Sequence, residues 1–210
     1  MNPAELAKVE ALPLHSRTPA EWGRAVLADP IPLLIDHAFL EKKAANNALE
    51  LLTRWPGDWV DGWVETMTGV ARDEAAHLAQ VTRILRRRGA RLERVHKNPY
   101  ANALRLLVRK GDPAEITDRL LVSALIEVRS CERFAVLAAE SGDGELADFY
   151  AALFASEFGH YRVFLELARK IAGAHAAEAR WQELLASEAR ILAAQEIGPR
   201  IHSGCARRDG

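Results

Sequence analysis

Two segments of the chain place a carboxylate and an imidazole three residues apart, a spacing that puts both groups on one face of an α-helix. They are residues 74–77 (EAAH) and residues 157–160 (EFGH). A single pair supplies few ligands, but two pairs that face one another across a helical bundle can hold two metal ions. A third match at residues 93–96 (ERVH) shows that the spelling alone is weak. The secondary structure predicted around each match must therefore show which matches can form a metal site.

The elements that position these residues are predicted to be helices. Ala and Leu dominate, β-branched runs are scarce, and apolar residues recur at three-to-four spacing almost throughout. We expect helices over about 31–53, from a turn at 55–58 to about 88, from the Asp-Pro pair at 112–113 to about 140, and over about 145–172. Two antiparallel hairpins joined by a long crossover describe an all-α, ferritin-like four-helix bundle.

Shorter elements flank this bundle. Residues 18–21 (TPAE) read as a capping box that opens a lead-in helix ending near residue 29, and a short helix is expected after Asn98 within the crossover. A further helix over about 175–196 should cover one side of the bundle, and the tail at 200–210 should be mobile. We therefore expect one domain over residues 1–210, with its bundle core at about 31–172.

Equal distance from a hairpin turn predicts which carboxylates lie at the same height. Glu41 and Glu74 average to position 57.5, beside the first turn, and Glu127 and Glu157 average to 142, inside the turn at 141–144. Pairing Glu132 with Glu157 would move the centre to 144.5. Glu132 also lies about 140° around the helix from Glu127. Glu127 is therefore the better partner, and we assign Glu132 to a position behind the ligands or on the surface.

The resulting set combines four carboxylates and two imidazoles in the middle of apolar helix faces, an arrangement typical of a carboxylate-bridged centre with two Fe ions. The alternative is a metal-free polar core in which buried arginines neutralise the carboxylates. Candidates for that role are Arg72, Arg129, Arg133 and Arg162. The predicted metal ligands are Glu41, Glu74, His77, Glu127, Glu157 and His160.

The remaining histidines are expected to have other roles. The pair Glu93 and His96 lies beyond the helix stop at Gly89 and has no partner helix, so it is not predicted to bind metal. His37 stands one turn before Glu41 and could approach the centre, but a hydrogen-bonded position at the bundle edge is favoured. Surface positions are expected for His15, His175 and His202.

Charge is strongly polarised along the chain although the net charge is only −1. Residues 83–110 contain ten Lys or Arg and one acid, a composition suited to phosphates, and the aromatic rings among them suit stacking on an exposed base. A solvated basic surface is the alternative. The candidate RNA contacts are Arg86, Arg87, Arg88, Arg91, Lys97 and Tyr100.

Other features narrow the class of protein. No run of 18 apolar residues is present, and the start of the chain lacks the pattern of a signal peptide, so we expect a soluble, cytoplasmic protein without a membrane partner. Cys131 and Cys205 lack the spacing of a thiolate metal site, and Cys131 is expected to be a small core residue.

Four stretches of sequence resemble the tRNA hydroxylases of the MiaE type. They are LIDHAFLEKKAANNALEL, ARDEAAHLAQV, LIEVRSCERFAVLA and SEFGHYRVFLELA, and the likeness covers most of residues 30–172. The resemblance implies O2-dependent hydroxylation of the isopentenyl group of 2-methylthio-N6-isopentenyladenosine, next to the anticodon of tRNA. It also implies that the same six residues bind iron. The resemblance does not identify RNA-contacting residues of this chain as firmly.

A second likeness concerns Asp73, which directly precedes Glu74. The spelling Asp-Glu-x-x-His resembles that of bacterial multicomponent di-iron monooxygenases, and by that resemblance Asp73 would orient His160 across the bundle. No flavin, nicotinamide or iron–sulfur motif is present, so a separate electron-donor protein or reductase is expected. The alternatives are a di-iron oxidase, hydroxylase or peroxidase of another substrate, and a metal-free helical RNA-binding protein.

Overall fold

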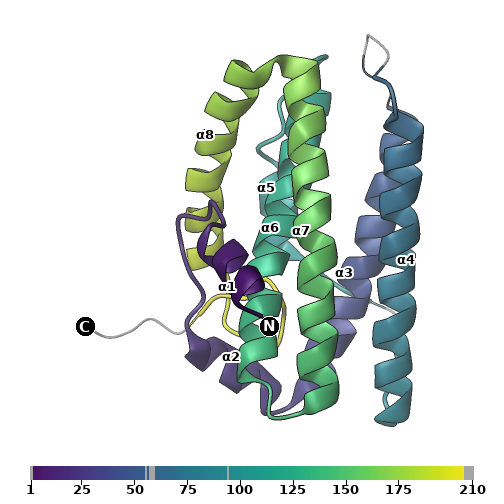
Figure 1. Ribbon diagram of the computed structural model, residues 1–210, viewed down its shortest axis with the longest axis vertical. Coiled ribbons are helices and arrows are strands. Elements are labelled where there is room, and N and C mark those ends of the chain that lie inside the picture. Colours follow the sequence, from purple (N-terminus) through teal and green to yellow (C-terminus); the bar gives the residue numbers. More distant parts are fainter. Residues whose placement is uncertain (1, 55, 57–59, 94, 206–210) are drawn as a thin grey trace.

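The computed structural model describes residues 2–54, 56, 60–93 and 95–205. This part of the chain contains eight α-helices and no named strand, so the predicted all-α fold is confirmed (Figure 1). None of these helices has a stretch long and apolar enough to cross a membrane. In chain order the helices are α1 (Pro3–Glu10), α2 (Ala20–Leu27), α3 (Pro30–Leu51), α4 (Trp63–Arg87), α5 (Pro99–Arg105), α6 (Ala114–Glu140), α7 (Gly144–Ala172) and α8 (Ala174–Ala193).

Four long helices form the predicted ferritin-like bundle. α3 packs along α4, and α6 packs along α7, so that Figure 1 shows one blue hairpin beside one green hairpin. α8 covers α6 and α7 on the side away from α3 and α4, and α2 packs across α6. The predicted helix bounds are confirmed within a few residues, except that α4 begins at Trp63 rather than near residue 58. Part of the predicted first turn, at 55 and 57–58, lies outside the described residues.

The predicted end of α4 at Gly89 depends on that residue's backbone. Gly89 has a φ of +74°, in the left-handed region that glycine adopts without a steric penalty. This conformation lets the Ala90 amide donate to the Leu85 carbonyl at 3.0 Å, which satisfies a carbonyl that the helix end leaves free. The chain then leaves the bundle and returns through α5 before α6 begins.

The predicted capping box at 18–21 is wrong. The Thr18 side chain does not cap α2. Its hydroxyl instead donates to a Glu132 carboxylate oxygen at 2.5 Å, and its backbone amide contacts the other oxygen at 2.5 Å. The sequence could not show this, because the partner lies more than 100 positions away.

α6 is buried on nearly all sides rather than along one stripe. Its inner face meets α7, and its outer face lies beneath α2, α8 and the segments that flank the bundle. Glu132 is therefore buried, not on the surface, and it pairs with Arg129 at 3.0 Å. Cys131 is fully buried and free, as expected of a small core residue.

The C-terminal segment corrects two expectations. Residues 201–204 are buried, and the Ser203 carbonyl accepts a hydrogen bond from the Arg133 guanidinium at 2.8 Å, so this part of the tail is held against α6. His202 is buried and stacks on Tyr100, whereas His15 and His175 are exposed as predicted. Residues 206–210 lie outside the described residues.

Candidate metal centre

The four bundle helices bring the six predicted ligands to one level. Glu41 comes from α3, Glu74 and His77 from α4, Glu127 from α6, and Glu157 and His160 from α7. All six residues are buried, with exposed fractions of 7% or less. Ionisable groups at these positions interrupt otherwise apolar faces, so they must be compensated by one another or by bound cations.

Two of the carboxylates each reach both imidazoles. The Glu74 oxygens lie 3.6 Å from His77 Nδ1 and 2.8 Å from His160 Nδ1. The Glu157 oxygens lie 3.1 Å from His77 Nδ1 and 3.0 Å from His160 Nδ1. Both imidazoles therefore turn the same nitrogen toward a common centre, and each of these carboxylates spans it as a bridging ligand of two metal ions would.

The other two carboxylates lie one on each side of this pair. A Glu41 oxygen is 3.6 Å from His77 Nδ1, and Glu127 interacts with Glu157 and lies near enough to His160 for the imidazole charge to lower the pKa of Glu127. Ligand atoms of Glu41, Glu74, His77 and Glu157 all lie within 4.8 Å of one another. The arrangement has two similar halves, one with His77 and Glu41 and the other with His160 and Glu127.

The electrostatics of the centre favour bound cations. Burial, together with the charges of Glu157 and Glu74, raises the pKa of Glu127 well above its usual value, and burial also raises the pKa of Glu41 and Glu74. Burial opposes the charged form of His77, but Glu157, Glu41 and Glu74 outweigh it and raise its pKa to about 12. The same balance with Glu157 and Glu74 raises the pKa of His160 to about 11. The crowded carboxylates of Glu41, Glu74 and Glu157 thus favour the protonated form of the imidazoles that they contact when no metal compensates them.

Several buried atoms of the centre lack a well-aligned hydrogen bond. These are both Glu74 oxygens, Glu157 Oε1 and His77 Nδ1. They approach one another closely without forming aligned hydrogen bonds, as expected of atoms that share a bound metal ion. Two divalent ions would neutralise four carboxylates, so this buried cluster fits a di-iron site.

The arginines considered as metal-free partners are occupied elsewhere. Arg129 pairs with Glu188 and Glu132, and Arg72 pairs with Asp73. Arg133 donates to a backbone carbonyl and stacks on Trp22 at 3.9 Å, and Arg162 lies over Phe158. In the part of the chain that the structure describes, no arginine forms an ion pair with any of the six predicted ligands. The metal-free polar core is therefore disfavoured.

Asp73 lies where the second resemblance places it. One of its oxygens is 3.6 Å from His160 Nε2, on the side of the ring opposite the centre. That distance is longer than a hydrogen bond. Its other oxygen accepts from the Arg72 guanidinium at 2.9 Å and 3.0 Å. Arg72 thus holds the carboxylate close to the imidazole that it is predicted to orient.

His37 is not at the bundle edge. It is fully buried, and its Nε2 lies 2.5 Å from a Glu41 oxygen, while its ring packs against Phe134 and Tyr150. Burial and the charge of His77 lower the pKa of His37 to about 4, so it is neutral. A neutral imidazole beside Glu41 can fix that carboxylate's orientation. The position of His37 one turn before Glu41 was the sequence signal for this contact.

The third Glu-x-x-His match is not part of the centre. Glu93 is exposed, whereas His96 is half-buried and stacks on Phe39. His96 bridges Lys43 at 2.8 Å and Asp36 at 2.7 Å. Its ring nitrogens are thus occupied by side chains of α3, and the exclusion of this match as a site agrees with the structure.

Not all of the predicted RNA contacts are exposed and unpaired. Tyr100 is buried and donates its hydroxyl to Glu188 at 2.9 Å, so its assignment as a base-stacking residue is wrong. Arg87 and Arg88 pair with Glu145, and Arg88 also pairs with Asp143 at 2.7 Å. Four of the candidates are exposed, and of these Arg87 is held in an ion pair, which leaves Arg86, Arg91 and Lys97.

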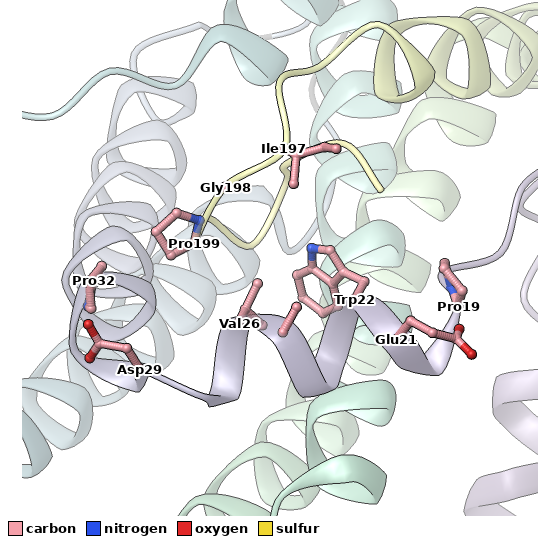
Figure 2. A pocket seen from close by; sticks show the side chains of 10 residues that line it. Pro19, Glu21, Trp22, Val26, Asp29, Pro32, Ile197, Gly198 and Pro199 are labelled. Carbon is pink, nitrogen blue, oxygen red and sulfur yellow. The ribbon is translucent and has the colours of Figure 1, made fainter. Parts of the chain in front are cut away.

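Two hollows of similar size lie on the described part of the molecule, besides a larger one of about 790 Å³ along α7 and α8 that none of the six predicted ligands lines. One, of about 580 Å³, is lined by α2, the start of α3 and residues 197–199, and Figure 2 shows Trp22 and Val26 facing Ile197 and Pro199 across it. None of the six predicted ligands lines that hollow. The other, of about 610 Å³, lies between α3, α5 and α6 and has Glu127 among its lining residues. Of these two hollows, only the second is lined by one of the six predicted ligands.

Comparisons with known proteins identify relatives over most of the chain. The chain resembles a tRNA 2-(methylsulfanyl)-N(6)-isopentenyladenosine(37) hydroxylase of Pseudomonas putida, with 43% identity over 188 residues that cover 89% of this chain and 90% of that protein. A Salmonella typhimurium protein of the same name is 29% identical over 239 residues, covering 91% of this chain and 87% of the relative.

A solved structure has the same fold. It is described as protein 43 with aldehyde deformylating oxygenase activity from Synechococcus, and it matches with a TM-score of 0.85 and 32% identity over 94% of this chain and 98% of that one. Residues 5–203 match the family described as tRNA-(MS[2]IO[6]A)-hydroxylase (MiaE). The chain therefore belongs to the MiaE family of tRNA hydroxylases.

Proposed function

We propose that this protein is an O2-dependent di-iron monooxygenase that hydroxylates the isopentenyl group of 2-methylthio-N6-isopentenyladenosine in tRNA. The observation that carries the proposal is the convergence of two imidazoles and four buried carboxylates, with Glu74 and Glu157 each reaching both imidazoles. Membership of the family supports the choice of substrate. We further propose that the protein acts in the cytoplasm, where tRNA is modified.

In this proposal the six residues hold two iron ions, which when bound supply the activation of O2 and the oxidation of a C–H bond. Glu74 and Glu157, which each reach both imidazoles, would help to hold both ions, and Glu41 and Glu127 would each complete one half of the site. His37 keeps Glu41 in place through the 2.5 Å contact, and Asp73 restrains His160 from outside. The apolar faces of the four helices keep bulk water from the centre.

The reaction requires a separate electron donor. Inserting one oxygen atom of O2 into a C–H bond and releasing the other as water consumes two electrons and two protons beyond those of the substrate. The two cysteines are far apart in sequence, and Cys131 is fully buried, so the described residues offer no iron–sulfur site. We therefore propose a reductase or electron-carrier protein as a partner, besides tRNA.

The direct test uses protein loaded with iron, a reductant, O2 and bulk tRNA. After digestion, mass spectrometry should detect the isopentenyl-modified nucleoside with a mass gain of one oxygen atom. Protein that keeps reduced iron but produces no such gain would remove the tRNA assignment.

Aldehyde deformylation is the second candidate, because the matched Synechococcus structure belongs to a protein with that activity. The hollow that reaches Glu127 bears five basic side chains among its lining residues, which suits an anionic polymer better than a neutral aliphatic aldehyde. Conversion of a long-chain aldehyde at a rate above that on tRNA would favour this candidate instead.

Replacing Asp73 with alanine is expected to weaken iron binding or activity by roughly 10- to 100-fold, because a carboxylate that orients a ligating imidazole contributes at that scale. Iron titration and turnover with tRNA measure the effect. Asp148→Ala, at an exposed position on α7, is the matched control and should leave both unchanged. Equal behaviour of the two variants would show that Asp73 has no role at the centre.

Reversing the charge of Arg91 and Lys97 together is expected to weaken tRNA binding. Both side chains are exposed, and each phosphate contact that is lost should reduce the slope of log K against log salt by about 1. Filter binding over a series of KCl concentrations measures affinity and slope. Lys170→Glu, at an exposed position on α7, is the control. An unchanged slope in the double variant would move the RNA surface away from these residues.

A further inference from the structure

We propose that the hollow between α3, α5 and α6 receives the modified nucleoside, with the prenyl group in its inner part and the flanking phosphates at its basic rim. This inference rests on the proposed function and adds to it the route by which single-stranded RNA reaches the centre. The hollow has a volume of about 610 Å³, enough for a nucleobase with its substituent.

The hollow follows one face of each of two helices down to a ligand. On α6 its lining includes Glu115, Arg119, Ser123 and Glu127, which succeed one another at four-residue steps and so lie on one face. From the first to the last of these the helix rises by about 18 Å. The hollow therefore leads from the surface to Glu127, whose carboxylate belongs to the buried cluster.

The inner part of the hollow is apolar. Leu40 and Ala44 of α3 and Val122 and Ile126 of α6 line the hollow, and Ile126 directly precedes Glu127. A branched five-carbon group gains free energy when it leaves water for such surroundings. These side chains would hold the prenyl arm beside the ligands and exclude water from it.

Halfway along the hollow, one polar bridge joins the two helices. Ser123 donates its hydroxyl hydrogen to the Arg119 carbonyl at 2.9 Å, so its oxygen must accept from the Asn47 amide, which lies 2.9 Å away. This fixes the orientation of the Asn47 side chain. Its carbonyl oxygen accepts no hydrogen bond from another described residue and can accept from the exocyclic N–H of an N6-substituted adenine.

The basic side chains at the rim of the hollow differ in whether ion pairs hold them in place. Arg119 pairs with Glu115 and Glu50, and Arg109 pairs with Asp118, so these two are held in place. Arg105 and Lys110 are exposed and form no ion pair in the described part of the chain. Leu106, beside Arg105, is 87% exposed and offers an apolar surface to an unstacked base. Free cations with an exposed apolar side chain suit single-stranded RNA.

This rim differs from the arginine cluster at the end of α4. Arg88 contacts Asp143, just beyond the C-terminal end of α6, whereas Arg119 lies near the start of the same helix. The two positions are separated by about 30 Å along α6. Charge reversal at the rim and at the far end of the molecule can therefore be compared in separate variants.

The test uses an anticodon stem-loop that carries 2-methylthio-N6-isopentenyladenosine. Ala44→Phe should fill the inner hollow, leave two iron ions per chain and reduce hydroxylation at least roughly 100-fold. Ala79→Phe, at an exposed position on α4, is the matched control and should react normally. Arg105→Glu should weaken stem-loop binding roughly tenfold at low salt, whereas Arg190→Glu on the exposed face of α8 should not. Normal hydroxylation by Ala44→Phe, or equal binding by both charge variants, would overturn the proposal.

A crosslinking experiment separates this proposal from the proposed function. A stem-loop with a photoreactive diazirine on its N6 substituent should crosslink to residues 40–47 or 122–127, as mapped by peptide mass spectrometry. Crosslinks there in a protein that never hydroxylates tRNA would support the binding route and overturn the proposed function. Crosslinks confined to other segments in an active protein would overturn the binding route alone.

Discussion

Replacing Glu74 with alanine is expected to abolish iron loading and hydroxylation together. Glu74 is fully buried, and its two oxygens approach both imidazoles, so its loss removes a contact from each half of the centre. Removal of a residue that only orients a ligand lowers metal affinity or activity by about 10- to 100-fold. We expect removal of a bridging ligand to lower activity by more than about 100-fold. The iron content should fall from two ions per chain to fewer than one.

The control must separate metal binding from helix stability. Glu65→Ala removes a carboxylate from an exposed position on the same helix and should retain two iron ions per chain. Glu157→Ala should reproduce the loss seen for Glu74→Ala, because Glu157 also reaches both imidazoles. Circular dichroism verifies that the variants remain helical. A folded Glu74→Ala protein that keeps two iron ions and full activity would refute the bridging role.

The second large effect is expected on stability. Replacing Glu188 with alanine should lower the free energy of unfolding by about 3–5 kcal/mol, because it leaves the buried charge of Arg129 without its main partner. Arg129 and Glu188 are both fully buried, at 0% exposure, and are joined by contacts of 2.8 Å and 3.0 Å. Tyr100 also loses the acceptor of its hydroxyl. Urea denaturation followed by circular dichroism measures the change.

Two further variants show whether the unpaired charge is the cause. Glu183→Ala removes an exposed carboxylate from the same helix, where it pairs with Arg180, and should cost less than about 1 kcal/mol. Combining Arg129→Met with Glu188→Met removes both charges and should recover most of the loss, since apolar replacements of a buried pair are often tolerated. A double variant as unstable as Glu188→Ala would mean that shape, and not charge, dominates this region.

The bundle was predictable from sequence because its determinants are local. The spacing of apolar residues, the helix end at Gly89 and the turns between helices each depend on residues that are close together in sequence. The equal-distance rule then located Glu41 opposite Glu74 and Glu127 opposite Glu157, since a hairpin converts sequence distance from the turn into height. The structure brings all four together with His77 and His160.

The errors concern contacts made between distant parts of the chain. Thr18 looks like a helix cap, but its partner is Glu132 on another helix. Tyr100 lies in a basic segment, yet its own side chain points to Glu188. The tail that carries His202 is polar and was expected to be mobile, but it is held by Arg133. Each of these polar groups is paired with a group that is distant in sequence. The periodicity of the sequence does not reveal such pairs.

The most direct measurement follows the oxygen atom itself. Iron-loaded protein, reductant and tRNA containing 2-methylthio-N6-isopentenyladenosine are incubated under ¹⁸O2, and the released nucleosides are analysed by mass spectrometry. The proposed function predicts one ¹⁸O atom in the isopentenyl group, present with the wild-type chain and absent with Glu74→Ala. Hydroxylation that takes its oxygen from water, or label that appears equally with Glu74→Ala, would contradict it.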